Sequence, residues 1–230
     1  MAARKTLKLD FAVAVDELKP TPAERRRATQ RNRIAREAAT IFEEHGGEKE
    51  GGHDKTTAEE IADRSDISVR TFFRYYQSKT DAIYVDVPSA VSAHLALTST
   101  LLERMRPADA SLAASVVLLT NSLRHPSAAN RLLQAMSSEI FVARRSTLRQ
   151  EWRQDLADLI APQIADQISD ARERQLQSLT LATSTLNIRE IAMEYWYWNE
   201  GRIPVVDCFN KALATNQQTS QSEIPRALSA

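Results

Sequence analysis

The chain is poor in residues that interrupt a helix or cross-link one. Only five of its 230 residues are glycine, and four of those five lie together between positions 46 and 52. Alternating runs of β-branched residues do not recur, whereas Ala, Leu, Arg, Glu and Gln are plentiful. This composition is typical of helical proteins. We therefore predict an all-α fold, long enough for a small domain and a larger one.

Cysteine and long apolar runs are also scarce. Cys208 is the single cysteine, which excludes an intrachain disulfide and is typical of a protein of the reducing cytoplasm. No stretch approaches about eighteen consecutive apolar residues. The first residues lack the basic and then apolar pattern of a secretory signal. We expect a cytoplasmic protein without a membrane-spanning segment.

Motifs of common catalytic centres are absent as well. The sequence contains no nucleophile elbow, phosphate loop, zinc-ligand spacing or dinucleotide fingerprint, and its four histidines are scattered. Four side chains that could bind a metal occur in the glycine-rich segment 45–55, namely His45, Glu48, His53 and Asp54. Their spacing matches no metal motif, and we interpret the segment as a mobile surface insertion. We therefore predict no enzyme activity, no cofactor and no metal site.

Positive charge is concentrated in part of the chain, although the net charge is zero. Residues 1–36 carry ten Lys or Arg and four Asp or Glu, whereas residues 43–63 carry eight acids and two lysines. Residues 64–79 carry three Arg and one Lys against one Asp. Such a localised patch is typical of a surface that faces phosphate groups.

The segment from Ser68 to Lys79, S-V-R-T-F-F-R-Y-Y-Q-S-K, predicts a short helix with two different faces. Ser68 lies where an N-cap belongs. At about 100° per residue, the apolar face consists of Val69, Phe72, Phe73 and Tyr76, and the opposite face of Arg70, Thr71, Arg74 and Tyr75. Guanidinium, hydroxyl and phenol groups suit phosphate oxygens and base edges. An ordinary amphipathic surface helix is the alternative interpretation of this segment taken alone.

A second helix is predicted just before this one. Thr57 and Glu60 form a capping box with Thr57 as the N-cap, and the helix ends near Ser65. The short turn between the two helices has the dimensions of a helix-turn-helix, which lays its second helix in the major groove of DNA. A third cap at Ser78 places Lys79 in the first turn of the next helix. A phosphate bound there would meet both the amides and the lysine.

Residues Thr56 to Ile83, T-T-A-E-E-I-A-D-R-S-D-I-S-V-R-T-F-F-R-Y-Y-Q-S-K-T-D-A-I, resemble the DNA-binding motif of the tetracycline-repressor (TetR) family. The family pattern is roughly T-x-x-x-I-A-x-x-(A/L)-G-V-S-x-x-T-(F/L)-Y-x-Y-F-x-S-K-x-x-L, and most of its key positions are filled. The resemblance implies an all-helical homodimer with an N-terminal three-helix DNA-binding domain. It also implies a C-terminal domain that dimerises and binds a small-molecule inducer, which the sequence does not identify.

The resemblance further implies roles for individual residues. Arg70 and Thr71 would face bases and phosphates. Tyr75 and Lys79 would contact backbone phosphate, and Thr57 would contact phosphate at the start of its helix. Together with the cap and the polar face of the second helix, the predicted DNA-binding residues are Thr57, Ser68, Arg70, Thr71, Arg74, Tyr75 and Lys79.

Three positions depart from the family pattern. Asp66 replaces the usual turn glycine, and Asp tolerates a left-handed φ better than most residues. Phe73 replaces a tyrosine whose hydroxyl often reaches phosphate, so that contact is absent. Tyr76 replaces a buried phenylalanine, and its hydroxyl needs a partner or access to solvent.

We divide the chain into four parts. Residues 1–20 form a basic arm, either a solvated tail or an arm that reaches a DNA minor groove. Residues 21–86 form the helix-turn-helix domain, and the arginines of its first helix either lie in solvent or approach the DNA backbone. Residues 87–213 form a helical ligand-binding and dimerisation domain. The polar residues 214–230 are expected to be disordered.

Prolines and aromatic residues mark the helices of the larger domain. Pro88 either bends the helix that follows Ser78 or separates two helices. A long helix is predicted from about residue 171 to Gly201, and a last short helix from Pro204 to about Leu213. The aromatic run of the long helix, Tyr195, Trp196, Tyr197 and Trp198, covers every direction around its axis. The resemblance to the TetR family implies a homodimer through the last two helices, which pair with their copies in that family. An aromatic run of this size requires burial on several sides and suits such an interface.

The main hypothesis is a sequence-specific DNA-binding transcriptional regulator, most often a repressor in this family. A homodimer would bind a palindromic operator and would be released by a small molecule that binds the non-DNA state more tightly. The alternative is a helical ligand- or protein-binding module whose helix-turn-helix serves as a scaffold. Asp66, Phe73 and the zero net charge favour that alternative. Salt-dependent binding to duplex DNA would separate the two hypotheses.

Overall fold

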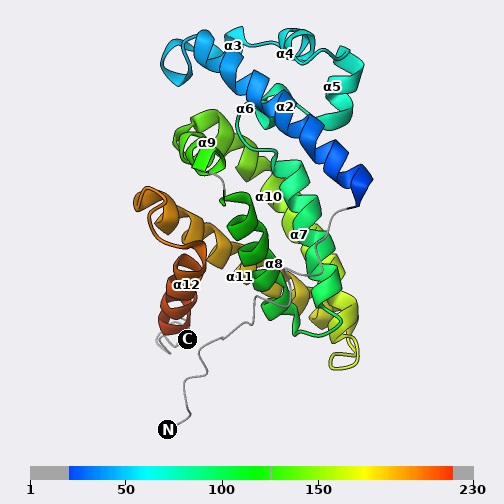
Figure 1. The fold of residues 1–230 in the computed structure, drawn as a ribbon. Helices are drawn as coiled ribbons and strands as arrows, with labels where there is room; N and C mark the ends of the chain where they lie inside the picture. The colour runs from blue at the N-terminus through cyan, green and yellow to red at the C-terminus, as the bar shows by residue number, and fades with distance from the viewer. Residues whose placement is uncertain (1–20, 125, 220–230) are drawn as a thin grey trace, which may run out of the picture. The chain divides into compact units, whose positions relative to one another are not determined.

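The computed structural model describes residues 21–124 and 126–219, and the regular structure of these residues is helical throughout (Figure 1). The all-α prediction is confirmed. The described residues form two compact units, one of residues 21–93 and 126–152 and the other of residues 94–124 and 153–219. The predicted basic arm lies outside the described residues. The predicted domain boundary at residue 86 differs from this division, because residues 126–152 group with the N-terminal helices.

The first unit is built around the long helix α2 (Pro22–Glu44). Its other helices are η1 (Glu48–Glu50), α3 (Gly52–Lys55), α4 (Ala58–Arg64), α5 (Val69–Tyr75), α6 (Lys79–Ile83), α9 (Pro126–Ser137), and the first parts of α7 (Val87–Leu101) and α10 (Glu139–Ile160). Ile34, Ile41 and Phe42 of α2 form one core with Ile61 of α4 and Phe72 of α5. Burial of this apolar surface positions α5.

The three predicted N-caps are confirmed. Thr57 accepts a hydrogen bond from the Glu60 amide at 3.1 Å, and Ser68 accepts one from the Thr71 amide at 3.1 Å. Ser78 accepts from the amide three residues later at 3.2 Å. Each cap satisfies one of the backbone donors that a helix start leaves without an intrahelical partner. Three short helices therefore begin at residues fixed by local chemistry.

The glycine-rich segment 45–55 differs from the expected mobile surface loop. It forms η1 and α3, and Gly47 and Gly52 are buried. A Cβ added to Gly52 would lie 2.6 Å from the carbonyl oxygen of Phe42, so only glycine permits this close approach of two backbones. Tyr84 also donates a hydrogen bond to Glu48 at 2.6 Å. The segment is part of the packed unit because its glycines allow contacts that other residues would block.

Pro88 lies in the first turn of α7, after a break that follows α6. The side chain of Asp86 accepts a hydrogen bond from the Ser89 amide at 3.0 Å and so caps α7. A proline in the first turn lacks an N–H that would have no intrahelical partner anyway. Of the two interpretations left open by the sequence, the structure shows two separate helices.

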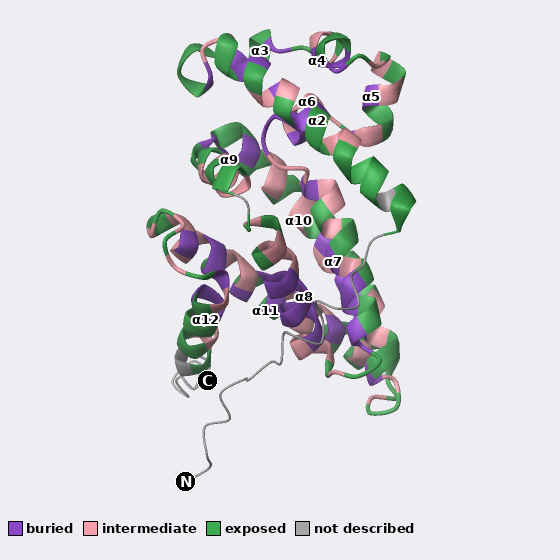
Figure 2. Cartoon of the chain, viewed as in Figure 1, coloured by how far each residue is buried: buried purple, intermediate pink, exposed green. Residues whose placement is uncertain are grey.

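The second unit contains α8 (Pro107–Ser122), η2 (Ala161–Ile164), α11 (Ala171–Trp198), α12 (Val205–Thr219) and the remaining parts of α7 and α10. Within it, α11 packs against both α12 and α8. Every residue of α8 from Ala110 to Val117 is buried (Figure 2). The expected disorder from residue 214 is wrong in part, because α12 continues to Thr219. Residues 220–230 lie outside the described part.

Candidate nucleic-acid interface

The exposed face of α5 consists of Arg70, Phe73 and Arg74. Phe72 is buried at the centre of the opposite side. The prediction that Phe73 belongs to the apolar face is wrong, since 53% of this residue is exposed. Phe73 is turned by about 100° from Phe72, and the core covers a narrower arc of this short helix than the apolar residues span. Phe73 is therefore a candidate DNA contact that the periodicity of the sequence assigned to the core.

Tyr76, the C-cap of α5, connects this helix to α2. Its hydroxyl donates a hydrogen bond to the carbonyl oxygen of Arg31 at 2.9 Å, and the Arg31 guanidinium carbon lies 4.8 Å from the Tyr76 ring centroid. Burial raises the pKa of the Tyr76 phenol above its ordinary value. Arg31 also forms an ion pair with Asp86. The required partner of the Tyr76 hydroxyl is thus a backbone carbonyl, and the end of α5 is fixed to α2.

Tyr75 is half-buried and lies near two guanidinium groups. The guanidinium carbons of Arg27 and Arg74 are each 5.6 Å from its ring centroid. Arg27 also donates a hydrogen bond to the carbonyl oxygen of Arg74 at 3.4 Å. Arg27 comes from α2, so two helices contribute positive charge beside the same phenol. The predicted phosphate contact of Tyr75 stays a prediction, and this charge favours it.

Three predicted contacts have intramolecular partners in this structure. Thr57 and Ser68 cap their helices, and the hydroxyl oxygens of Ser68 and Thr71 lie 2.9 Å apart. Thr71 is half-buried. A hydroxyl can both accept and donate, so capping does not prevent a contact with phosphate. The roles of these residues in DNA binding stay predictions.

Lys79 is held by the segment that precedes the helix-turn-helix. Its ammonium group donates to the carbonyl oxygens of His53 at 2.7 Å and Thr56 at 2.9 Å. These bonds explain a cation at the start of α6, where the helix dipole disfavours it. Because an ammonium group has three donors, one remains for the predicted phosphate.

The turn between α4 and α5 has the geometry that the sequence anticipates. Asp66 has a φ of 52°, in the left-handed region, and the Ile67 amide donates to the carbonyl oxygen of Ala62 at 3.0 Å. Asp therefore occupies the position of the usual glycine without a change of turn. Asp66 therefore no longer favours a scaffold function over DNA binding.

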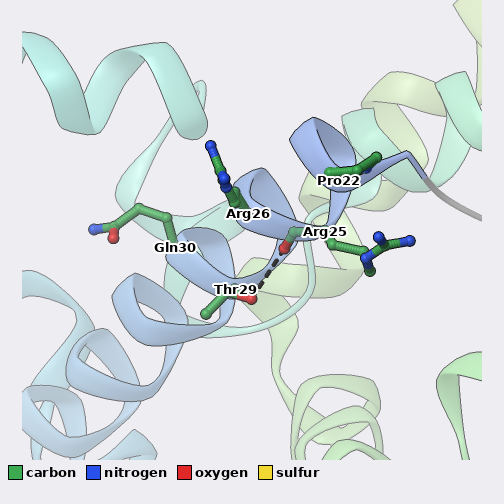
Figure 3. A pocket seen from close by; sticks show the side chains of 5 residues that line it. All are labelled: Pro22, Arg25, Arg26, Thr29 and Gln30. Atoms are coloured by element: carbon green, nitrogen blue, oxygen red, sulfur yellow. Dashed lines mark hydrogen bonds between the residues drawn. The ribbon is translucent and has the colours of Figure 1, made fainter.

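The start of α2 carries a small surface hollow lined by Pro22, Arg25, Arg26, Thr29 and Gln30 (Figure 3). In this view the side chains of Arg25 and Arg26 extend away from the helix, while Thr29 donates to the Arg25 carbonyl oxygen at 2.9 Å. Exposed guanidinium groups at a helix start suit phosphate oxygens. These arginines are therefore candidates for contacts to the DNA backbone.

An ion pair that sequence reasoning missed connects α10 to α6. Arg144 donates to the two carboxylate oxygens of Asp81 at 3.3 and 3.1 Å, and to the side-chain oxygen of Gln77 at 3.4 Å. The Asp81 carboxylate is buried and also accepts from the Ser78 hydroxyl at 2.7 Å. The partners are distant in sequence, so no local pattern identifies them. Arg144 fixes the residues that follow α5.

The described residues offer neither a metal site nor a membrane-spanning helix. Residues 21–124 and 126–219 contain no group of three or more His, Cys, Asp or Glu that could hold a metal ion. Within the same ranges, no helix has both the length and the apolar character needed to span a bilayer.

Comparison with known proteins gave one family and individual relatives. Residues 49–81 match the model of the family described as bacterial regulatory proteins, tetR family. The chain is 27% identical over 184 residues to a candidate transcriptional regulator of mycofactocin biosynthesis, MftR, from Mycobacterium tuberculosis, covering 76% of this chain and 84% of that protein. The crystal structure of the TetR-family repressor FadR of Thermus thermophilus with lauroyl-CoA is 19% identical, with a TM-score of 0.45, over 85% of this chain and 97% of that one.

Proposed function

We propose that this chain is a DNA-binding transcriptional regulator of the tetR family of bacterial regulatory proteins, which its similar proteins support, and that it binds a palindromic operator through α5. The observation that carries this proposal is the exposed face of Arg70, Phe73 and Arg74 on a capped helix fixed at both ends. The family match covers the same segment. Guanidinium groups recognise guanine edges and phosphates, and α5 would present them in the major groove.

The active form is a homodimer that joins through the last two helices. Three large apolar residues are exposed on α11, with Leu176 at 68%, Ile191 at 46% and Trp198 at 70% exposed. Ile191 and Trp198 lie seven positions apart and so share one side of the helix. A second copy of the chain would cover this side. Two α5 helices would then enter successive major grooves about 34–36 Å apart.

A small molecule would release the dimer from DNA, and residues 87–213 would bind it. Such a ligand acts only if it binds the non-DNA state more tightly than the DNA-binding state. A regulator of this kind would act in the cytoplasm, where the operator lies, and repression is the expected output.

Selection of bound sequences from random duplex DNA tests this function. The purified chain at about physiological salt should enrich a palindrome whose half-site centres lie about one helical turn apart or a multiple of it. A protein that was unfolded and refolded to remove any bound small molecule should be selected in parallel. If neither preparation enriches a sequence, the DNA-binding function is refuted and the scaffold hypothesis takes its place.

A further inference from the structure

Phe73 is an exposed apolar residue of α5 that lies close to two cationic residues. It is 53% exposed, while Arg70 and Arg74 lie on the same side of α5. Its ring contacts the buried Phe72 ring edge-on, with centroids 5.2 Å apart and an interplanar angle of 82°. An edge-to-face contact restricts the ring to few orientations. The exposed part of the ring is therefore held in place on the exposed face of α5.

The chemistry of this ring limits what it can recognise in DNA. A phenylalanine ring has no N–H or O–H to donate, so it offers a phosphate oxygen no hydrogen bond. The base edges in the major groove present hydrogen-bond donors and acceptors, and thymine alone of the four bases adds an apolar group, its C5-methyl. Contact with that methyl removes apolar surface of both partners from water.

We propose that Phe73 reads the C5-methyl group of a thymine in each half-site of the operator. This inference rests on the proposed function, because it requires α5 to lie in the major groove. It assigns sequence selectivity to a residue that periodicity places in the core and that lacks the phosphate-binding hydroxyl of the usual tyrosine.

The position of Phe73 relative to Arg70 predicts where this thymine lies. Residues three apart are neighbours on a helix surface, and they are separated by about 4.5 Å along the axis. Successive base pairs are separated by about 3.4 Å. A helix that lies along the groove therefore brings the two side chains to neighbouring base pairs. The thymine read by Phe73 should lie about one step from the base pair read by Arg70.

Replacement of thymine by deoxyuridine tests the proposal, because the two bases differ only by the C5-methyl group. The selected operator is synthesised with deoxyuridine at each thymine position in turn, in one half-site and then in both. Wild-type affinity should fall about fourfold for one half-site and about fifteenfold for both, at a single position, from the free energy of burying one methyl-sized group. Substitution at the other thymines should have little effect.

Variants of the chain assign this effect to Phe73. Phe73→Ala should bind the thymine and deoxyuridine duplexes equally, whereas Phe73→Leu should keep part of the preference because its side chain is still apolar. Arg70→Ala serves as the matched control, since it should lose affinity for both duplexes and keep their ratio. Thermal unfolding of each variant checks that the fold is intact, which the exposure of Phe73 favours.

The outcomes separate the role of Phe73 from operator binding itself. If the wild type tolerates deoxyuridine at every thymine of the half-site, or if the half-site contains no invariant thymine, the role of Phe73 is refuted while operator binding stands. The same conclusion follows if Phe73→Ala keeps the wild-type ratio. If no duplex is enriched by the wild type, the proposed function itself fails.

Discussion

At the scale of a single residue, Lys79 has a structural role in the fold and a predicted role in DNA binding. Its ammonium group donates to the carbonyl oxygens of His53 and Thr56, and its predicted partner on DNA is a phosphate. Lys79→Met should lower the free energy of unfolding by about 2 kcal/mol, because two acceptors lose a charged donor. If Lys79 also neutralises a phosphate, the plot of log binding constant against log salt concentration should become shallower by about 0.9.

Denaturant unfolding and DNA binding at several salt concentrations measure these two effects on one variant. The exposed Arg172 at the start of α11 supplies the control, since Arg172→Met removes a cation that has neither task. A destabilised Lys79→Met variant with an unchanged salt slope would limit this residue to a structural role. Unchanged stability would mean that the two carbonyl contacts add nothing to the fold.

The structural roles that depend on neighbouring residues in the chain were predictable from the sequence. Ser68 and Thr57 act as caps because their hydroxyls reach amides of the same turn, and Asp66 fits a left-handed turn. Periodicity misplaced Phe73, because it gives the direction of an apolar face and not the width that the core covers, whereas the resemblance aligns Phe73 with a tyrosine that often contacts phosphate. The partners of Lys79 were missed because carbonyl oxygens carry no sequence signal.

At the scale of helices, the ion pair of Arg144 with Asp81 fixes α10 against the start of α6. The carboxylate is buried, so Arg144→Met should lower the free energy of unfolding by about 3–5 kcal/mol by leaving that charge without its partner. Removing the charge as well, in the double variant Arg144→Met with Asp81→Asn, should recover much of this loss, because the asparagine oxygen still accepts from Ser78. Denaturant unfolding measures both variants.

DNA binding by the Arg144 variants distinguishes a loss of overall stability from a displacement of α5. Arg144 also donates to Gln77, two residues after α5. If it positions α5, the double variant should recover stability and still bind the operator more weakly than wild type. Equal recovery of stability and DNA affinity would show that the ion pair serves the fold alone. The pairing itself joins segments distant in sequence, so it could be found only from the folded chain.

The packing of α7 against α8 in the second unit is expected to depend on pH. His94 is buried and its ring nitrogen lies 3.0 Å from the carbonyl oxygen of Ser111. Burial lowers the pKa of His94 from 6.5 to about 4. The unfolded chain therefore binds a proton below about pH 6.5, while the folded chain does not until about pH 4. The stability that the neutral ring supports is complete above pH 6.5 and is lost as the pH falls toward 4.

The change should amount to roughly 3 kcal/mol across this interval. His94→Gln cannot take up the proton, so its free energy of unfolding should fall less than that of wild type between pH 7.5 and 4.5. Urea unfolding at both pH values supplies the comparison. Parallel curves for the two proteins would contradict the assignment, since the remaining acidic groups are common to both.

At the scale of the whole molecule, the proposed dimer connects α11 to DNA binding. Ile191→Arg would place a charge on the apolar side of α11 that a second copy covers, and its desolvation would be unfavourable. We expect a dimer for wild type and a monomer for this variant in sedimentation equilibrium. The monomer should also lose most of its preference for the complete palindrome over a single half-site.

Ile140→Arg is a matched control, because Ile140 is exposed on α10 in the other unit. It should remain a dimer and bind the palindrome as wild type does. A wild-type chain that sediments as a monomer, or an Ile191→Arg variant that remains a dimer, would exclude this side of α11 as the subunit interface.

The turn at Asp66 has a consequence for how related chains diverge. A residue other than glycine at a φ of 52° carries roughly 1–2 kcal/mol of steric energy. Glycine avoids that energy but gives the unfolded chain more freedom, at a cost of roughly 0.5–1 kcal/mol. The two effects oppose each other and leave a difference of at most about 1.5 kcal/mol in favour of glycine, so a stable chain tolerates exchange between Asp and Gly here. Homologues can therefore drift between these residues, and a signature that insists on a turn glycine would overlook genuine members of the lineage.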